Sequence, residues 1–292
     1  MPIQVRYYTD PACPWSWGTE PKLRRLEWEF GDDLRFRWVL GGLARSYGPA
    51  YRDRESGITG DRDCFDSLIS SWLDAAAETG MPMDPRIWRR SPLASTYPVC
   101  QAVKAATEQG PGAAAAYLRR AREAIFCERR KLDHAAALIE EAGGAGLDVA
   151  RFEIDLASHA ITEAFAADLD EVRDVPAEAR EEGKTGETEG RERISFPSAV
   201  FVGEDGERQG VWGWQPYERL RETALGAGAK VAEDRRPQAM EAIERFGRCA
   251  TREIEELTGR PRPPVEAELW ALAAEWKLRP IPALTGTLWE PA

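Results

Sequence analysis

The sequence predicts an α/β fold in which a strand, a helix and a second strand come first and a hairpin with a closing helix comes last. Residues 3–8 and 34–40 alternate apolar and polar side chains as strands do, and residues 17–30 repeat apolar side chains at helical spacing. Two strands joined by a helix run parallel with a right-handed crossover. Residues 198–212 then predict a hairpin, which adds the last two strands, and residues 216–225 predict the closing helix.

Two further segments differ from this sheet-forming sequence. The alanine-rich stretch that follows the second strand is amphipathic and predicts several helices inserted into the fold, whereas residues 175–193 are rich in Glu, Gly and Arg and predict a mobile loop. The last part shows three helical stripes and a short hairpin, the order of a winged helix. We therefore divide the chain into residues 1–62, 63–174, 175–230 and 231–292.

The last of these parts is expected to bind protein rather than DNA. Its third helix, near residues 264–276, carries three glutamates and no Lys or Arg, which is poor chemistry for a major groove. We interpret this part as a winged-helix-like α+β module that docks a partner protein.

Cys13 lies where the first strand turns into the first helix, in the run Asp10-Pro11-Ala12-Cys13-Pro14-Trp15-Ser16. Pro14 suits the first helical position, which needs no backbone N–H donor, so we expect Cys13 at the N-cap. The unpaired N–H groups and the positive end of the helix macrodipole favour an anion there and lower the pKa of a thiol. This position predicts a reactive thiolate.

Ser16 follows Cys13 by three residues, at the position where a dithiol oxidoreductase has its second cysteine. Positions i and i+3 share a helix face, so we expect the Ser16 hydroxyl to hydrogen-bond the Cys13 thiolate. A hydroxyl does not resolve a mixed disulfide, and the predicted site is therefore monothiol. Trp15 is a candidate substrate platform, although tryptophans at helix starts are as often packing residues.

The amino-acid composition argues against several classes of function. The chain has 292 residues, 43% of them hydrophobic, and a formal net charge of −11, which argues against sequence-blind binding to nucleic acid. Its five cysteines form no C-x-x-C pair, and with two histidines they give no metal-ligand spacing. Neither a signal-peptide pattern nor a membrane-length apolar run is present, so the expected location is the cytoplasm, with reduced thiols.

These motifs together resemble the DsbA family, in which a helical domain is inserted into a thioredoxin fold. The resemblance depends on the Cys13 run, on Ser95-Thr96-Tyr97-Pro98-Val99-Cys100 and on Phe196-Pro197, and it covers roughly residues 1–225. It implies a cis peptide bond before Pro197, which faces the reactive cysteine. Two cytosolic groups are similar: the kappa-class glutathione transferases with their isomerase relatives, and the adaptors that deliver the regulator Spx to a protease.

The resemblance also implies a set of site residues. Catalytic roles fall to Cys13, Ser16 and Pro197, and substrate contacts to Pro14, Trp15, Phe196 and Tyr97. Cys100 is a candidate resolving thiol, for which its Cα must lie within about 7 Å of that of Cys13. The alternative is a buried helix cysteine that only packs.

Different classes of function remain open on this basis. The leading hypothesis is a thiol–disulfide oxidoreductase or isomerase in which Cys13 forms a mixed disulfide with a protein substrate. It needs no bound cofactor, and glutathione or another low-molecular-weight thiol is the candidate co-substrate. The alternative is a non-catalytic adaptor or redox sensor that binds a partner protein. A glutathione-dependent transferase or isomerase is a weaker alternative, and neither nucleic acid nor a membrane is an expected partner.

Overall fold

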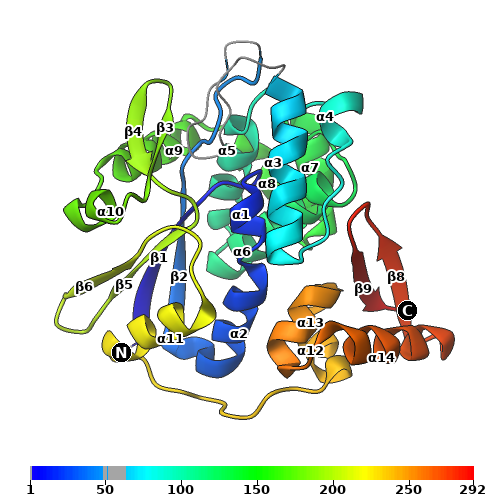
Figure 1. The fold of residues 1–292 in the computed structure, drawn as a ribbon. Helices are drawn as coiled ribbons and strands as arrows, with labels where there is room; N and C mark the ends of the chain where they lie inside the picture. Colours follow the sequence, from blue (N-terminus) through cyan, green and yellow to red (C-terminus); the bar gives the residue numbers. More distant parts are fainter. Residues whose placement is uncertain (1, 49–50, 52–63) are drawn as a thin grey trace.

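The computed structural model describes residues 2–48, 51 and 64–292. In this part of the chain the largest sheet is four-stranded, with the order β2-β1-β5-β6 (Figure 1). Its strands are β1 (Ile3–Thr9), β2 (Leu34–Leu40), β5 (Ser198–Val202) and β6 (Arg208–Val211). β1 pairs with β2 in parallel and with β5 antiparallel. The predicted thioredoxin-like arrangement is therefore confirmed.

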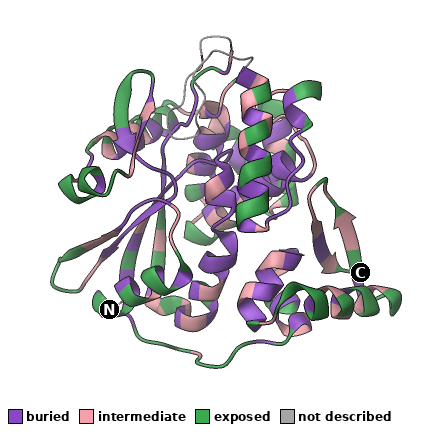
Figure 2. Cartoon of the chain, in the orientation of Figure 1, coloured by how far each residue is buried: buried purple, intermediate pink, exposed green. Residues whose placement is uncertain are grey.

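One face of this sheet packs against two helices, α2 (Glu20–Phe30) and α11 (Tyr217–Gly226). Ile3, Val5 and Tyr7 alternate along β1, are almost completely buried, and belong to one core cluster with side chains of both helices. Burying a large apolar side chain stabilises a fold by about 1.5–3 kcal/mol. The period-2 pattern of β1 thus fixes which face of the sheet these helices cover. Figure 2 shows the ribbon coloured by burial, with buried residues along the central strands and helices.

The first helix differs from its prediction. Instead of one helix over residues 17–30, a short helix α1 (Pro14–Trp17) comes first, and α2 begins only at Glu20. Pro21 has no N–H to donate to Trp17, so an unbroken helix would lack a hydrogen bond there. Gly18 lies at the break because a Cβ at this position would come within 2.3 Å of the Thr79 side chain.

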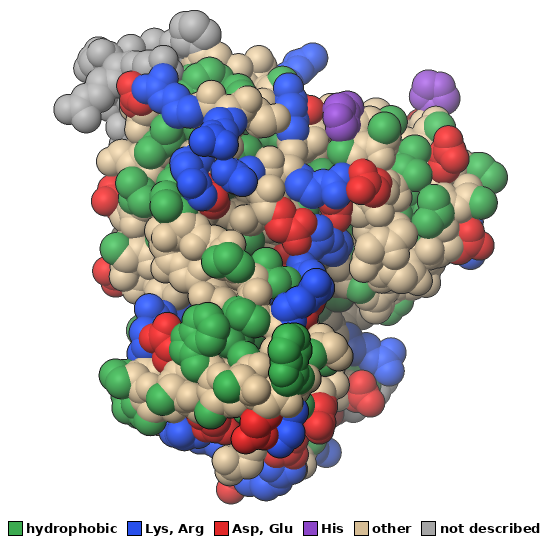
Figure 3. Space-filling model, turned by 90° about the vertical axis from the view of Figure 1, so that its right-hand side faces the viewer, with side chains coloured by type: hydrophobic (Ala, Val, Ile, Leu, Met, Phe, Trp, Pro, Cys, Tyr) green, Lys and Arg blue, Asp and Glu red, His purple; other side chains and the backbone are tan. Residues whose placement is uncertain are grey.

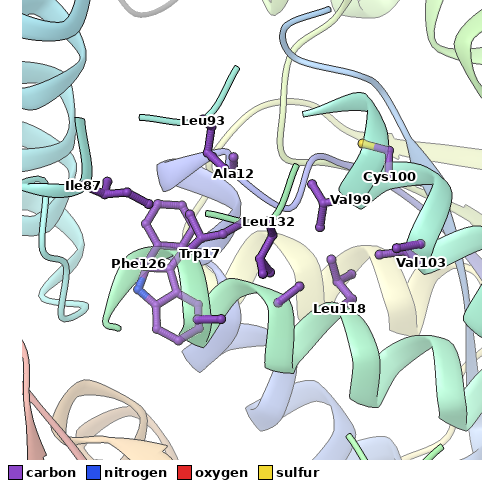
Figure 4. Close-up of a cluster of buried hydrophobic side chains, with 14 of the residues drawn as sticks. Ala12, Trp17, Ile87, Leu93, Val99, Cys100, Val103, Leu118, Phe126 and Leu132 are labelled. Carbon is purple, nitrogen blue, oxygen red and sulfur yellow. The ribbon is translucent and has the colours of Figure 1, made fainter. Parts of the chain in front are cut away.

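The inserted segment between β2 and β5 is helical, as predicted. Its main helices are α3 (Cys64–Thr79), α4 (Ile87–Arg90), α5 (Tyr97–Thr107), α6 (Pro111–Phe126), α7 (Ala135–Gly144), α8 (Val149–Leu156) and α9 (His159–Arg173). Figure 4 shows their shared core, where Trp17 of α1 stacks on Phe126 with ring centroids 5.7 Å apart. Among the described residues, no helix combines the length and the apolar character that crossing a bilayer requires.

The prediction of a mobile loop over residues 175–193 is wrong. This segment forms helix α10 (Ala177–Glu181) and an antiparallel hairpin of β3 (Thr185–Thr188) and β4 (Arg191–Ile194). Composition was misleading because the segment contributes only a few apolar side chains, Val175 and Ala179, but both are buried in a cluster with Cys13. Its glutamates are also matched by arginines: Arg180 donates to Glu192 at 2.9 Å.

The C-terminal module follows the predicted order. It comprises α12 (Ala239–Phe246), β7 (Cys249–Ala250), α13 (Thr251–Thr258), α14 (Arg262–Ala274), β8 (Leu278–Pro282) and β9 (Thr287–Pro291). The three strands form a sheet with the order β7-β9-β8, and α13 packs along α2 (Figure 1). The second hairpin strand, which the sequence predicts over residues 285–289, is β9 and lies two residues further along the chain. The winged-helix interpretation of this module stays a prediction.

Candidate functional site

Cys13 occupies the N-cap of α1, as the sequence predicts. Its backbone is extended, with φ −77° and ψ 116°, Pro14 is the first helical residue, and the Cys13 N–H donates to the Asp10 carbonyl at 3.2 Å. The Cys13 Sγ accepts a hydrogen bond from the Ser16 backbone N–H at 3.4 Å. An N–H at a helix start stabilises a sulfur anion, so the local geometry is the one that supports a thiolate.

Ser16 takes part through its backbone and not through its hydroxyl. The expected hydrogen bond from the Ser16 side chain to Cys13 is not formed, and the buried Ser16 Oγ has no hydrogen-bond partner in the part of the chain that the structure describes. The sequence argument placed both residues on one helix face. Cys13 is however the N-cap, so its sulfur lies along the helix axis, where the N–H groups point.

The Phe196–Pro197 peptide bond is cis and lies against Cys13. The Cys13 thiol donates to the Phe196 carbonyl with a sulfur to oxygen distance of 3.7 Å. The Phe196 ring is held between the guanidinium of Arg193, 4.2 Å from its centroid, and Gly41, where a Cβ would come within 1.7 Å of the ring. Phe196 and Pro197 thus lie where the resemblance implies.

The space above Cys13 is small and apolar. Cys13 is 4% exposed, and the adjoining cavity has a volume of about 20 Å³. It is lined by Ala12, Cys13, Pro14, Trp15, Leu43, Tyr47, Tyr51, Leu68, Ser71, Trp72 and Phe196. One water molecule needs about 10–15 Å³, whereas small-molecule sites typically have about 300–1,000 Å³. In this state the cavity has room for a water molecule and not for a glutathione.

Among the aromatic residues of the two motifs, Trp15 lines the Cys13 cavity, whereas Trp17 and Tyr97 do not. Trp15 lines the Cys13 cavity and packs against Trp214, with ring centroids 5.8 Å apart. Trp17 is completely buried and donates to the Pro82 carbonyl at 2.9 Å, so it is a core residue. Tyr97 does not line the cavity: its ring packs on Phe165, and its hydroxyl donates to Glu189 at 3.2 Å.

Cys100 is directed at a buried carboxylate. Its sulfur donates to Asp10 Oδ2 at 3.4 Å, and burial together with Asp10 raises the pKa of the Cys100 thiol well above its usual value. Asp10 is fully buried and accepts hydrogen bonds from the backbone N–H groups of Ala12 at 2.8 Å and Leu43 at 2.7 Å. Burial raises the pKa of Asp10 as well. A resolving role for Cys100 stays a prediction, and in this conformation its thiol is in the protonated, less nucleophilic form.

The remaining cysteines are buried in packing environments. Burial raises the pKa of the Cys127 thiol, and it raises the pKa of Cys249 to about 11. None of the five cysteines forms a disulfide in the described chain. The described residues also include no cluster of three or more His, Cys, Asp or Glu side chains arranged to hold a metal ion.

Sequence reasoning missed two features of this site. Asp10 accepts a hydrogen bond within its own turn from the Ala12 N–H, and it also binds the segment after β2 through the Leu43 N–H and helix α5 through the Cys100 thiol. The wall of the cavity formed by Leu68 and Trp72 of α3 was also missed. The apolar stripe of α3 is visible in the sequence, but nothing in one sequence indicates that this stripe covers Cys13.

A family model described as Thioredoxin matches residues 7–177, more than half of the chain. The chain belongs to the thioredoxin family. Solved structures show a DsbA-like form of this fold. A candidate protein disulfide isomerase from Nitrosomonas europaea superposes with a TM-score of 0.60 at 19% identity, over 78% of this chain and 100% of that one. The cytosolic disulfide reductase DsbM from Pseudomonas aeruginosa superposes with a TM-score of 0.55 at 21% identity, over 76% of this chain and 98% of that one.

Curated relatives match almost the whole chain, and they are named as adaptor proteins and not as disulfide enzymes. The "ClpXP adapter protein SpxH" of Halalkalibacterium halodurans is 27% identical, over 99% of this chain and 89% of the relative. The protein of the same name from Bacillus subtilis is 24% identical, again over 99% and 89%. The chain is thus a thioredoxin-family protein with a DsbA-like fold that is similar in sequence to proteins named as Spx adaptors, and the DsbA-like structures leave about a fifth of it unmatched.

Proposed function

We propose that this protein is an adaptor that binds a partner protein and presents it to a protease of the ClpXP type. The observation that carries the proposal is the match to relatives named ClpXP adapter over 99% of this chain, C-terminal module included. The adaptor alternative is thereby preferred over the oxidoreductase, which was the leading hypothesis from the sequence. The proposal places the chain in the cytosol, where such a protease works.

The connection between the C-terminal module and the DsbA-like part supports this proposal. Glu253 of α13 is fully buried and pairs with Arg24 of α2 at 3.0 Å and with Arg119 of α6 at 2.6 Å. Buried ion pairs separate only at a large cost in free energy, because each ion would lose its partner. A partner protein therefore meets the two parts as one surface, which suits an adaptor.

The closed Cys13 site supports it as well. An enzyme that exchanges disulfides with many substrates needs its sulfur within reach, whereas Cys13 is 4% exposed beside a cavity of about 20 Å³. An adaptor needs no such access. In this proposal Cys13 is at most a redox sensor, whose modification requires the cavity to open.

The test is degradation of an Spx-type regulator by ClpXP with and without the full-length protein. We expect faster degradation in its presence and an unchanged acceleration with Cys13→Ala, because binding does not depend on the sulfur. No acceleration with any such regulator from the source organism would contradict the proposal. Deleting residues 232–292 is a poor control, since it would leave Arg24 and Arg119 without Glu253.

Thiol–disulfide exchange at Cys13 is the second candidate, and one contact favours it. The Ser16 N–H donates to the Cys13 Sγ at 3.4 Å, which stabilises the thiolate. In the exchange the Cys13 thiolate attacks a disulfide sulfur, a new S–S bond forms, and the other sulfur leaves as a thiolate that takes a proton from water. An external thiol such as glutathione then releases Cys13, because Ser16 cannot.

Alkylation of Cys13 against pH separates the two candidates. An exchange enzyme should be labelled rapidly and stoichiometrically near neutral pH, and Cys13→Ser should abolish reduction of a mixed glutathione disulfide. Slow labelling of the folded protein, with fast labelling after denaturation, would remove this second candidate and leave the adaptor proposal untouched.

A further inference from the structure

A groove with a volume of about 520 Å³ lies where the C-terminal module meets the DsbA-like part of the chain. Its walls come mainly from α2, the end of α3, the start of α11 with the residues before it, and α13. Sites that bind small molecules typically have about 300–1,000 Å³, whereas the cavity beside Cys13 has about 20 Å³. This groove, which we call the Lys22 groove after a lysine in its lining, therefore has room for a small molecule.

Lys22 lies in this groove as a buried amine without a counter-ion. The residue is 6% exposed, its Nζ donates to the Gln215 carbonyl at 2.6 Å, and it lies 3.5 Å from the Trp214 ring centroid. Among the residues that the structure describes, no carboxylate forms an ion pair with Lys22. An ammonium has three N–H donors, and burying it without an anion favours the neutral amine.

The charged side chains that face Lys22 do not restore the ammonium form. On α13, Glu256 favours the ammonium and Arg252 opposes it; Glu218 of α11 and Glu78 of α3 favour it with smaller contributions. Glu256 is also shared with two arginines, at 2.7 and 2.9 Å. Burial outweighs these charges and lowers the pKa of Lys22 from 10.5 to about 8. A group whose pKa is shifted in this way inside a groove is a candidate for chemistry.

Other lysines of the chain have carboxylate partners. Lys104 has a side chain that is 11% exposed, but it pairs with Asp168 at 2.9 Å. Lys277 has a side chain that is 57% exposed, and it pairs with Glu275 at 2.7 Å. Basic and acidic side chains likewise lie beside one another over much of the face shown in Figure 3. A lysine with such a partner stays protonated near neutral pH, so Lys22 differs from both in its charge state.

We propose that Lys22 is a nucleophilic lysine that takes up acyl groups from small activated carboxylic acids, such as thioesters, in the Lys22 groove. The nitrogen of the neutral amine attacks the carbonyl carbon, so a C–N bond forms and the C–S bond breaks. The sulfur leaves as a thiolate and takes the proton that the nitrogen releases, and no group is oxidised or reduced. At about pH 7.4 an amine with a pKa of about 8 is about 20% neutral, against about 0.1% for an ordinary lysine.

The product would lie between the two parts of the chain. Acylation replaces the ammonium by an amide, so the positive charge over the Trp214 ring is lost. The acyl group itself occupies the Lys22 groove between α2 and α13. This modification does not depend on whether the chain delivers proteins to a protease, and it goes beyond the proposed function.

The test treats the unaltered full-length protein with S-acetyl-N-acetylcysteamine, a small neutral thioester. Mass spectrometry then measures acetylation of each lysine, after hydroxylamine has removed acetyl groups from cysteines. At about pH 7.4 we expect Lys22 to react about ten-fold faster than any other lysine, because its larger neutral fraction outweighs its restricted access. Its rate should level off above about pH 8, whereas the rates of the other lysines should keep rising toward about pH 10.5.

Two lysines of the same molecule serve as internal controls. Lys104 tests burial with a carboxylate partner, and Lys277 tests exposure with one, so both should react slowly. Glu218→Gln removes a charge that favours the ammonium of Lys22 and should speed its acetylation by about two-fold near neutral pH. Glu222→Gln is the matched variant, because Glu222 is exposed on the same helix but does not line the Lys22 groove, and it should leave the rate unchanged.

Three outcomes would overturn the proposal. The first is acetylation of Lys22 that is no faster than that of Lys277. The second is a rate at Lys22 that keeps rising above pH 8 like the rates of the other lysines. The third is reaction of Lys22 only after the protein has been unfolded in denaturant, since the Lys22 groove would then give no access to the amine.

Discussion

The Cys13 cavity and the contact between α2 and the C-terminal module are built from opposite chemistry. The cavity is lined almost entirely by apolar and aromatic side chains, whereas the contact contains the buried charges Arg24, Arg119 and Glu253. Apolar walls can separate and re-form at modest cost, but a buried ion that loses its partner keeps its full desolvation penalty. The comparison indicates that the Cys13 site is the part able to open and the module contact the part that stays fixed.

Breaking the contact between α2 and the C-terminal module should have the largest effect on the free energy of unfolding. Glu253→Ala removes both arginine pairs and the cap on the Ala250 N–H, which Glu253 accepts at 2.6 Å. We expect the free energy of unfolding to fall by about 3–5 kcal/mol, because the buried guanidinium of Arg24 loses its carboxylate partner, while Arg119 keeps Glu20 and Glu123. Urea unfolding followed by tryptophan fluorescence measures this.

An exposed ion pair gives the control for that prediction. Glu241→Gln breaks the pairing with Arg235 on the surface of the same module, and it should leave the unfolding midpoint almost unchanged because solvent screens the pair. Equal losses from Glu253→Ala and Glu241→Gln would show that the buried contact is not special, and the comparison would fail.

Much of this fold could be predicted from the sequence because local periodicity encodes it. The alternation in β1 and β2, the N-cap at Cys13 and the helical stripes of the insertion all depend on neighbours in the chain. The hairpin of β3 and β4 was missed for a physical reason. Its stability comes from a few buried contacts, such as Ile194 in the cluster around Cys13, and composition counts cannot detect them.

The sequence predicted which residues form the candidate site, but not that the cavity beside Cys13 is closed. The sequence identified Cys13 because a helix start is a local feature, whereas Phe196 and Pro197 came from the resemblance to the DsbA family. It could not indicate that α3 closes the cavity or that Asp10 takes the Cys100 thiol as a donor, because both depend on how distant segments pack. The ion pairs of the C-terminal module were missed for the same reason.

Distorting the Cys13 cavity should have the next largest effect. A Cβ at Gly41 would come within 1.7 Å of the Phe196 ring, so Gly41→Ala must displace the ring that lies against Cys13. We expect a loss of about 1–3 kcal/mol in the free energy of unfolding, as for other overpacked cores. Alkylation of Cys13 should also become faster.

Gly112→Ala is the matched control, because a Cβ there meets nothing within 4 Å and the residue lies in the first turn of α6. It should be neutral or slightly stabilising. If Gly41→Ala were equally neutral and Cys13 remained as slow to react, the Phe196 ring would not be what closes the cavity.

Lys22 offers a pH-dependent test in the groove between α2 and α13. Its ammonium donates to the Gln215 carbonyl at 2.6 Å and lies 3.5 Å from the Trp214 ring centroid. Burial lowers the pKa of Lys22 from 10.5 to about 8, with partial compensation by Glu256. Between these two pH values the unfolded chain binds the proton that the folded chain has released, so stability rises with pH.

The measurement compares unfolding of the unaltered protein and of Lys22→Met across that window. The difference in stability between them should shift in favour of the unaltered protein as the pH rises from about 8 to 10.5. A difference that is flat over this range would mean that Lys22 keeps an ordinary pKa, and that the groove is more hydrated than its burial indicates.

The smallest effect is expected at Ser16, and it has an unusual sign. The buried Ser16 Oγ has no hydrogen-bond partner among the described residues, so Ser16→Ala removes a desolvated hydroxyl and should stabilise the fold by up to about 1 kcal/mol. Ser198→Ala is the contrast, because its hydroxyl donates to Ser195 and accepts from the Gly213 N–H, and its loss should destabilise by about 1–3 kcal/mol. Destabilisation by Ser16→Ala would instead reveal a partner for this hydroxyl in solution, such as a buried water molecule.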